Sequence, residues 1–322
     1  MKNRTNPILT IVVPCFNEFE VLNETTYELT NIIHGEIEAN KVSKKSRILF
    51  VDDGSSDETW NLILQLMDEN EFVTGIKFSR NFGHQNALLA GMETAVSESD
   101  CIITIDADLQ DDVNAIPKMI DEYHNNYDVV YGVRNNRDTD TWFKSKTAGM
   151  FYSLMKHMGV DMVANHADFR LLSQRAVRGL LKYQERNLFL RGAVPLVGYP
   201  STKVYYARKE RFAGDSKYPL KKMISFAMNG ITSFSTVPIR AIMYLGFGIV
   251  LISIIFMIYS IIVHFIGETT RGWSSLMVSI WFLGGVQLIG ISAIGEYVGK
   301  VFTEVKRRPR YEIESDLFNR KD

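Results

Sequence analysis

The first third of the chain alternates between short apolar runs and helical segments, and this alternation constrains the fold more than any other feature. The apolar runs, which cover residues 9–14, 47–52, 73–78 and 101–105, each lead through polar residues into a helical pattern. Consecutive strands in such a chain pair in parallel, because each helix carries the chain back across the sheet. The sequence therefore predicts an α/β fold with a doubly wound, mostly parallel sheet and polar loops at its carboxyl edge.

The helices and the further strands of residues 19–183 are expected from the same kind of pattern. Helices are expected over 19–40, 58–69, 85–96, 113–125, 138–158 and 173–183, and further strands over 128–132 and 168–172. Asp57 is expected to cap the second helix and Ser173 the last, since both residue types accept hydrogen bonds from free N–H groups at a helix start. The alternation weakens after residue 134.

The fourth apolar run ends in two carboxylates one residue apart, Asp106 and Asp108, within the sequence TIDADLQDD at 104–112. Ligands of open α/β sheets bind at the carboxyl edge of the strands, which is where these two side chains are expected. Two carboxylates at such an edge can hold a divalent cation, and the cation can hold a diphosphate. The alternative interpretation is an Asp-rich surface turn.

Two long apolar runs near the other end of the chain, Ala241 to Ile266 and Leu276 to Ile294, predict transmembrane helices. At 1.5 Å per residue they measure about 39 and about 28 Å, enough to cross a hydrocarbon core of about 30 Å. Basic residues follow the second run and Arg240 precedes the first, so both termini are expected on the cytoplasmic side. The net charge of −1 provides no basic field for a nucleic acid partner.

The segment just before the first apolar run has the pattern of an amphipathic helix. Apolar residues between 218 and 235 recur at helical spacing, and lysines lie elsewhere on the helix. A cationic amphipathic helix beside a membrane span is expected to lie in the membrane interface. The alternative is an ordinary surface helix packed on the globular domain.

Three motifs, in their order and spacing along the chain, resemble those of a known enzyme family, as do the two apolar runs that would form a transmembrane hairpin. The motifs are VVPCFNE at 12–18, VDDGSSDET at 51–59 and DADLQ at 106–110. The likeness covers residues 8 to 310 and is to inverting glycosyltransferase family 2, and within it to the polyprenyl-phosphate glycosyltransferases related to dolichol-phosphate mannose synthase. It is strongest to the two-span bacterial enzymes that load glucose or N-acetylglucosamine onto undecaprenyl phosphate.

The resemblance implies a particular organisation and chemistry. It implies a GT-A catalytic domain over 1–216, an interfacial helix region over 217–238, a transmembrane hairpin over 239–301 and a basic cytoplasmic tail over 302–322. It also implies a UDP-sugar donor, Mg²⁺ or Mn²⁺, an undecaprenyl phosphate acceptor and a place in the bacterial cell membrane. A homo-oligomer, such as a tetramer, is expected too, with a flippase and a further transferase acting on the product.

Donor and metal residues follow from the resemblance by position. Pro14, Asn17, Glu18 and Asp53 are expected to line the nucleoside pocket, Arg80 to face the phosphates, and Asp106, Asp108 and Gln110 to surround the metal. Independently of the family, a bound divalent ion stabilises the charge that builds up on a diphosphate leaving group. An Asp-Gly turn is the alternative role of Asp53. For His84 a polar helix start and a functional role are equally open.

The acceptor residues are expected in the second half of the chain. A polyprenyl monophosphate is largely ionised at pH 7, so the enzyme needs cations to position it rather than a strong base. The expected acceptor-phosphate residues are Arg170, Arg191, Arg208, Arg211, Ser216 and Lys217. Asp168 is expected to orient the acceptor or Arg170, and it completes the expected catalytic set with Asp106 and Asp108. A contact with lipid headgroups is the alternative role of the basic run at 208–217.

Two rival functions remain at this point. A processive polysaccharide synthase would share the GT-A domain, but it would carry a QxxRW motif and more spans, and neither is seen in the sequence. An inactive membrane scaffold or sugar-nucleotide sensor would not need the carboxylates of Asp106, Asp108 and Asp168. The sequence leaves the transferred sugar open.

Overall fold

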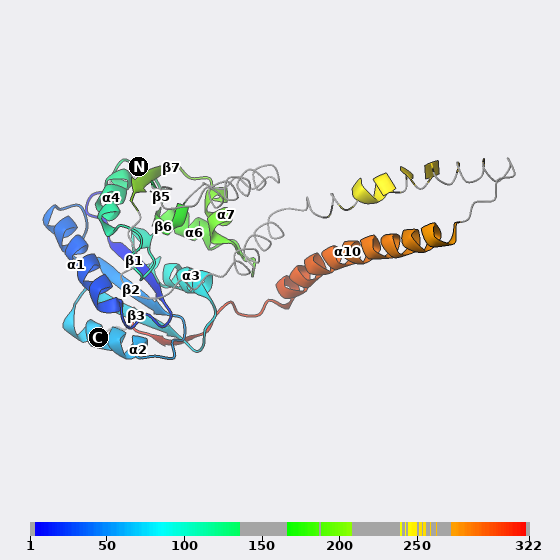
Figure 1. Cartoon of the computed structure of the whole chain (residues 1–322). Helices are drawn as coiled ribbons and strands as arrows, with labels where there is room; N and C mark the ends of the chain where they lie inside the picture. The colour runs from blue at the N-terminus through cyan, green and yellow to red at the C-terminus, as the bar shows by residue number, and fades with distance from the viewer. Residues whose placement is uncertain are drawn as a thin grey trace.

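The computed structural model of the chain describes residues 4–135, 166–186, 188–207 and 272–319, together with isolated residues and short pieces between 239 and 262. An eight-stranded sheet forms its centre, with the strand order β7-β5-β6-β4-β1-β2-β3-β8 (Figure 1). The strands are β1 (Leu9–Cys15), β2 (Arg47–Asp52), β3 (Val73–Phe78), β4 (Cys101–Thr104), β5 (Val129–Arg134), β6 (His166–Ser173), β7 (Ser201–Tyr206) and β8 (Ile313–Asp316).

The four strands of the first third pair in parallel, as the alternation predicts. β1 lies between β2 and β4, with Ile11 opposite Ile48 on one side and Ile103 on the other. β2 continues in parallel to β3. These strands are buried on both faces, which explains their continuous apolar sequences. The prediction of an α/β fold with a mostly parallel sheet is confirmed. β6 is an exception, because it runs antiparallel to both β4 and β5.

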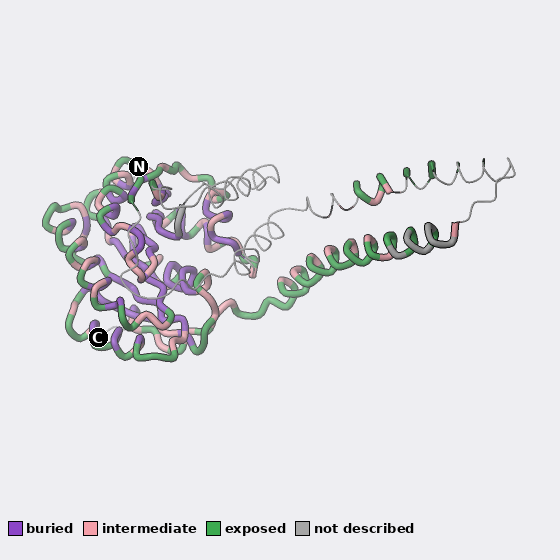
Figure 2. The backbone as a smooth tube through the Cα atoms, in the orientation of Figure 1, coloured by how far each residue is buried: buried purple, intermediate pink, exposed green. Residues whose placement is uncertain are grey.

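Helices cover both faces of the sheet, so the core has two layers. On one face lie α1 (Leu22–Glu38), α2 (Thr59–Glu69) and α4 (Ile116–His124), and on the other α3 (His84–Ala95), α6 (Gln174–Leu180) and α7 (Leu190–Leu196). Each helix packs its apolar residues against the strands, and the buried residues lie mostly between the two helix layers (Figure 2). This arrangement leaves the loops at the carboxyl edge free to form a site.

Helix boundaries differ from the predicted ones by a few residues. Ser173 caps α6 as predicted, accepting a hydrogen bond from the Ala176 N–H at 3.2 Å. The predicted cap of α2 is wrong by one position, since Glu58 occupies the N-cap, although its side chain makes no capping hydrogen bond to the helix backbone. Asp57 still contributes, because its carboxylate accepts the Thr59 N–H at 3.1 Å. A short 3₁₀ turn, η1 (Val113–Ala115), precedes α4 and takes the first residues of the predicted helix.

Beyond the sheet, α10 (Trp273–Lys306) extends as a single long helix away from the domain (Figure 1). Its segment Phe282–Lys306, with mean hydropathy 1.3, is the one helix in the described part of the chain that is long and apolar enough to cross a membrane. α10 continues past the predicted end of the second span at Ile294. The predicted helices at 138–158 and 218–235, and most of the first predicted span, lie outside the described residues.

The chain then returns to the sheet, which the sequence interpretation missed. β8 pairs antiparallel with β3, with Ile76 opposite Asp316, inside the stretch expected only as a basic tail. Phe318 is buried against the domain, and the guanidinium of Arg47 lies 5.4 Å from the centre of its ring. The end of the chain therefore connects α10 to the edge of the sheet.

Candidate active site

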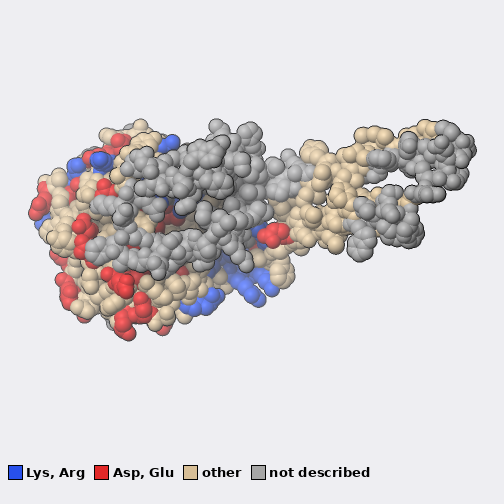
Figure 3. Space-filling model, viewed as in Figure 1, with Lys and Arg blue, Asp and Glu red and all other residues tan. Residues whose placement is uncertain are grey.

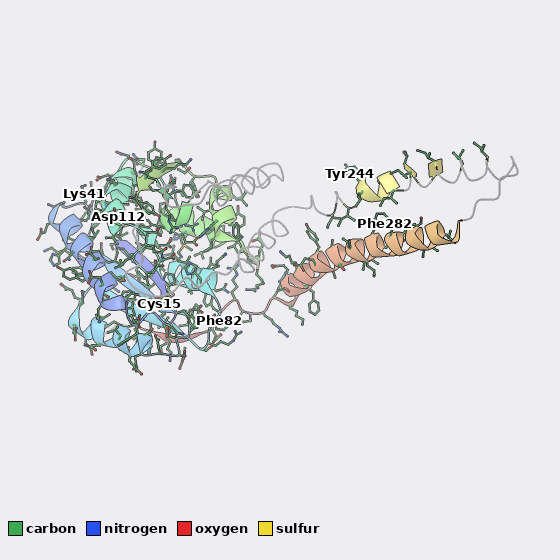
Figure 4. All side chains as sticks on the ribbon, viewed as in Figure 1. Cys15, Lys41, Phe82, Asp112, Tyr244 and Phe282 are labelled. Carbon is green, nitrogen blue, oxygen red and sulfur yellow. The ribbon has the colours of Figure 1, made fainter. Side chains whose placement is uncertain are left out.

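The ends of β1, β2 and β4 place three predicted motifs side by side at the carboxyl edge of the sheet. β1 ends at Cys15 just before Asn17, β2 at Asp52 just before Asp53, and β4 at Thr104 just before Asp106. Because β1 pairs with both β2 and β4, the loops that follow the three strands are neighbours. Cys15, at the end of β1, and Phe82, in the loop after β3, mark this part of the molecule (Figure 4).

Hydrogen bonds join the loop after β1 to the turn after β2. Asn17, which has a positive φ of 54°, accepts the Ser56 N–H on its side-chain oxygen at 2.9 Å and donates its own N–H to Ser55 at 3.0 Å. Glu18 donates its N–H to the Thr59 hydroxyl at 3.0 Å. Pro14 is buried within β1. The four predicted nucleoside-pocket residues, Pro14, Asn17, Glu18 and Asp53, thus lie in one region, and their contact with a nucleoside stays a prediction.

Asp53 binds the loop that connects β3 to α3. Its carboxylate accepts the Phe82 N–H at 2.6 Å and the Gly83 N–H at 2.9 Å. Burial raises the pKa of this carboxyl group, and the two N–H groups oppose that shift. Gly54, with φ of 64°, lies so close to the same loop that an added Cβ would be 2.3 Å from the Arg80 carbonyl carbon. The turn role of Asp53 is therefore real, and it fixes the shape of the loop beside the predicted donor site.

Asp106 carries a buried carboxylate oxygen that has the His84 ring 3.4 Å away but no hydrogen-bond partner in the described chain. The side chain is 35% exposed, yet Oδ1 is buried and has no hydrogen-bond partner among the described residues. Burial raises the pKa of Asp106 to about 6; His84 opposes this shift, whereas Asp111, Asp168 and Asp108 add to it. A buried carboxylate oxygen without a donor is costly unless a cation compensates it.

The two residues after Asp108 shape the rest of the DADLQ loop. Asp108 accepts the Gln110 N–H at 3.2 Å, and Gln110 is buried. Leu109 between them has φ of 53°, a left-handed conformation that is unusual for a bulky side chain and often marks a functional loop. The predicted metal residues Asp106, Asp108 and Gln110 therefore form one tight turn.

The described residues contain no group of three His, Cys, Asp or Glu side chains arranged to hold a metal ion. That count does not exclude the predicted ion, because Mg²⁺ in sites of this kind uses one or two carboxylates and takes its other ligands from water and substrate phosphates. The unsatisfied Oδ1 of Asp106 and the neighbouring carboxylate of Asp108 are hard oxygen donors at the right edge of the sheet. The residues present therefore fit a divalent cation.

β6 brings Asp168 and Arg170 to the same place. Its antiparallel pairing with β4 puts Arg170 opposite Thr104, and the Thr104 hydroxyl donates to the Asp168 carbonyl oxygen at 2.5 Å. The Asp168 carboxylate binds the guanidinium of Arg170 and that of Arg191, the latter at 3.0 Å. Burial would raise the pKa of Asp168, but Arg191, together with His84 and Arg170, holds it well below its usual range.

His84 lies between the two carboxylates and joins them. Its Nε2 is 3.4 Å from Asp106 Oδ1 and 3.6 Å from Asp168 Oδ2. Burial would lower the pKa of His84, but Asp106 and then Asp168 raise it to about 9. His84 is also the first residue of α3, so its place at a helix start is confirmed, and its functional role stays a prediction.

Arg170 is a buried cation, and two of its guanidinium nitrogens make no hydrogen bond to the described residues. The side chain is 2% exposed, and its Nε and Nη1 have no hydrogen-bond partner in the described part of the chain. Burial lowers the pKa of Arg170, and Asp168 opposes that shift. Buried donors of this kind normally have partners, so two free donors beside Asp168 indicate that an acceptor group belongs there.

A second network was missed by the sequence interpretation. Asp111 is buried and accepts hydrogen bonds from Arg134 at 2.7 Å and from the Tyr206 hydroxyl at 2.6 Å. Arg134 ends β5 and Tyr206 ends β7, so this contact connects the DADLQ loop to both strands. The repeated Asp in TIDADLQDD was a signal, but nothing in the sequence pointed to its two partners.

The remaining predicted residues divide into two groups. Arg80 is exposed; its guanidinium lies 3.9 Å from the centre of the Phe82 ring and donates to the Asn81 carbonyl at 3.1 Å. Among the described residues, its guanidinium forms no ion pair with the carboxylates of the site. Arg208, Arg211, Ser216 and Lys217 lie outside the described residues, so their acceptor role stays a prediction.

Comparison with known proteins adds independent information. The family described as glycosyl transferase family 2 matches residues 10–181. The glycosyltransferase YkoT of Bacillus subtilis is 54% identical over 98% of this chain and 94% of its own length. The bactoprenol glucosyl transferase of Shigella phage SfII is 41% identical over 95% and 97%. A solved structure of glucosyl-3-phosphoglycerate synthase from Mycobacterium tuberculosis, with Mn²⁺, UDP and phosphoglyceric acid, covers 70% of this chain and 76% of that one, at 13% identity and a TM-score of 0.46.

Proposed function

The chain belongs to glycosyl transferase family 2, and from that membership we propose that it is a membrane-bound inverting enzyme that transfers a sugar from a UDP-sugar to undecaprenyl phosphate. One observation carries the proposal. Among the described residues, the Oδ1 of Asp106 and two donors of Arg170 have no hydrogen-bond partner, and the contacts of His84 with Asp106 and Asp168 and of Asp168 with Arg170 bring these groups into one site. A site that needs both a cation and an anionic oxygen suits a phosphate acceptor facing a diphosphate donor.

On the donor side the residues at the ends of β1 and β2 would bind the nucleoside. Asn17, Glu18 and the turn after Asp53 form a hydrogen-bonded unit there, so little reordering is needed on binding. A bound Mg²⁺ or Mn²⁺ would stabilise the negative charge on the departing UDP as a Lewis acid. Asp106 and Asp108 would hold it, with Gln110 alongside in the same turn.

On the acceptor side the site supports positioning rather than proton abstraction. A phosphate monoester is already largely ionised at pH 7, so it can attack the anomeric carbon without a general base. Asp168 stays ionised between Arg170 and Arg191, and the low pKa of its carboxyl group makes it a weak base. We therefore assign it to holding the two guanidinium groups, which would bind the acceptor phosphate.

The relatives support the substrate class. Several relatives at about 40% identity are named bactoprenol glucosyl transferase, and the alignments cover nearly the whole of both chains. These names favour a polyprenyl phosphate acceptor and make glucose the first sugar to test. N-acetylglucosamine is the alternative. The product would be a lipid-phosphate-linked sugar for modification of cell-envelope glycans, moved on by a flippase and a second transferase.

The proposed enzyme is anchored in the bacterial cell membrane with its catalytic domain on the cytoplasmic side. The apolar segment Phe282–Lys306 supports one span, and the run Ala241 to Ile266 is proposed as the other. A homo-oligomer is proposed with them. A cysteine introduced at Ser274, near the proposed external link, should react with an impermeant maleimide in intact cells. Reaction only after lysis would contradict the hairpin.

The direct test of function is an assay of UDP release by the purified full-length protein. Release from UDP-glucose should require undecaprenyl phosphate and should stop with a chelator and resume with Mg²⁺ or Mn²⁺. Mass spectrometry of the lipid made from mixed UDP-sugars then identifies the sugar. Release that is indifferent to the lipid would overturn the proposed acceptor, and full activity in the chelator would overturn the metal assignment.

A further inference from the structure

A basic cavity lies where the end of α10 meets the catalytic domain. It has a volume of about 310 Å³, and the cations that line it are Arg186, Lys306, Arg308 and Arg310. Asn86 of α3 and Thr303 of α10 add neutral polar groups to the wall. Figure 3 shows Lys and Arg side chains gathered on the domain near the base of this helix.

The walls of the basic cavity are held by contacts from two sides. The Glu304 carboxylate accepts the Arg186 N–H at 2.7 and 2.9 Å, which joins α10 to the segment after α6. Arg310 donates to the carbonyl oxygens of Tyr183 at 2.6 Å and Glu185 at 3.1 Å. The next residue, Tyr311, stacks on Phe78 with ring centres 5.2 Å apart. These contacts therefore hold the segments that carry the cations in fixed positions.

The positive charge of the basic cavity is only partly compensated by its surroundings, since the one carboxylate of Glu304 lies beside four cations. Among the described residues, none of its four cations forms an ion pair with a carboxylate within 4.0 Å. The Nε of Arg310 is buried without a hydrogen-bond partner in that same part of the chain. Lys306 only lies over the Phe302 ring, with Nζ 4.0 Å from its centre. Clustered cations with an unsatisfied buried donor indicate an anionic ligand.

The position along α10 indicates where the anion comes from. Val298, Val301, Phe302 and Val305 are all exposed and recur at i, i+3, i+4 and i+7, so the last turns of the helix carry an apolar stripe. A stripe of this kind is suited to the boundary between lipid tails and headgroups. Lys306 and Arg308 follow it directly, at the level that headgroup phosphates occupy.

We propose that the basic cavity binds the phosphate group of a membrane lipid headgroup. The inference rests on α10 lying in a membrane, as proposed above, and not on which sugar is transferred. Bound there, the lipid would connect the end of α10 to α3, whose first residue is His84. It would help to hold the active site at a set height above the bilayer.

The test is a titration of the full-length protein in neutral detergent with phosphatidylglycerol that carries a fluorophore on its acyl chain. The double variant Lys306→Ala and Arg308→Ala should bind it about tenfold more weakly or worse, since charge-assisted contacts to phosphate are lost. The double variant Lys44→Ala and Lys45→Ala is the matched control. These exposed lysines lie just before β2, at the edge of the sheet where the parallel strands begin. The control should change binding by less than about twofold.

Competitors identify the source of the phosphate. Unlabelled phosphatidylglycerol or undecaprenyl phosphate should displace the probe, whereas inorganic phosphate at the same concentration should not. Equal displacement by inorganic phosphate would show a site for free anions and overturn the lipid assignment. The lipid assignment would also be overturned if the double variant bound the probe as tightly as the parent protein. A double variant that changed its oligomeric state, seen by light scattering, but kept its lipid binding would overturn it too. If the double variant does not fold, Arg308→Ala alone serves, since that side chain is exposed and makes no hydrogen bond or ion pair with the described residues. UDP release is measured separately, so failure here does not imply failure of the sugar transfer.

Discussion

The carboxyl-edge site and the basic cavity both concentrate charge, but they treat it in opposite ways. At the carboxyl edge Asp168, His84, Arg170 and Arg191 neutralise one another at close range, and only a few atoms are left without partners. In the basic cavity the one carboxylate of Glu304 lies beside four cations, none of which forms an ion pair within 4.0 Å among the described residues. The difference indicates that the first region is pre-organised for small ligands, whereas the second becomes neutral only when something outside the chain arrives.

The largest expected effect tests the first half of this comparison. Asp106→Asn keeps the shape of the side chain and removes its charge, so transfer should fall by roughly 10² to 10³-fold. The unfolding midpoint should change little, because burial raises the pKa of Asp106 and its charge therefore costs folding free energy, while His84 keeps Asp168 as a partner. Kinetics and thermal unfolding measure the two effects. Asp68→Asn, on the exposed side of α2, is the control and should behave as the parent. Equal losses in both variants would show that Asp106 has no special role.

The next effect concerns the free donors of Arg170. Arg170→Lys keeps the positive charge beside Asp168 but loses the planar fork, so kcat/KM for undecaprenyl phosphate should fall about 10 to 150-fold. The KM for the UDP-sugar should change little, because most of the proposed nucleoside-binding residues lie in the loops that follow β1 and β2. Arg175→Lys makes the same change in another Arg–Asp pair, with Asp128, outside the site. A similar loss in that control would mean that pairing, not acceptor binding, explains the result.

A smaller effect distinguishes the cost of a strained backbone angle from the cost of a steric collision at two glycines near the donor site. Gly54 and Gly83 both have positive φ, so alanine at either should cost about 1–3 kcal/mol of unfolding free energy. Gly54→Ala should cost more, because its Cβ would also collide with the backbone at Arg80, whereas the space beside Gly83 is open. Denaturant unfolding measures both. If the two variants are equally stable, the contact between the turn and the loop is looser than described.

The smallest effect tests the second half of the comparison. Glu304→Gln retains an oxygen that can accept the Arg186 N–H but removes a negative charge beside the basic cavity. Phosphatidylglycerol should then bind more tightly, by about twofold to fivefold, as expected for one partly exposed charge. Glu314→Gln on β8, where the partner is Lys77, is the control and should leave lipid binding unchanged. Weaker binding in the Glu304 variant would contradict the electrostatic account.

Much of the fold and part of the site could be predicted from the sequence, because both depend on local patterns. Strand periodicity and β-branched runs are local, and β3 begins and ends at the predicted residues. Asp106 and Asp108 could be placed at a sheet edge because they directly follow such a run. The cap at Ser173 depends on residues within three positions of it and was also predicted correctly.

Contacts between distant segments were decided only by the tertiary structure. The antiparallel insertion of β6 between β4 and β5 sets Arg170 against Thr104, and a neighbouring pairing joins Asp111 to Arg134 and Tyr206. Such partners are far apart in the sequence and have no shared period, so no local pattern identifies them. β8 is hidden for the same reason, since four residues after a long helix carry little signal until the open edge of β3 provides hydrogen bonds. The sequence by itself determined which chemical groups stand at the ends of the strands, and the packing of strands from distant parts of the chain decided which of them meet.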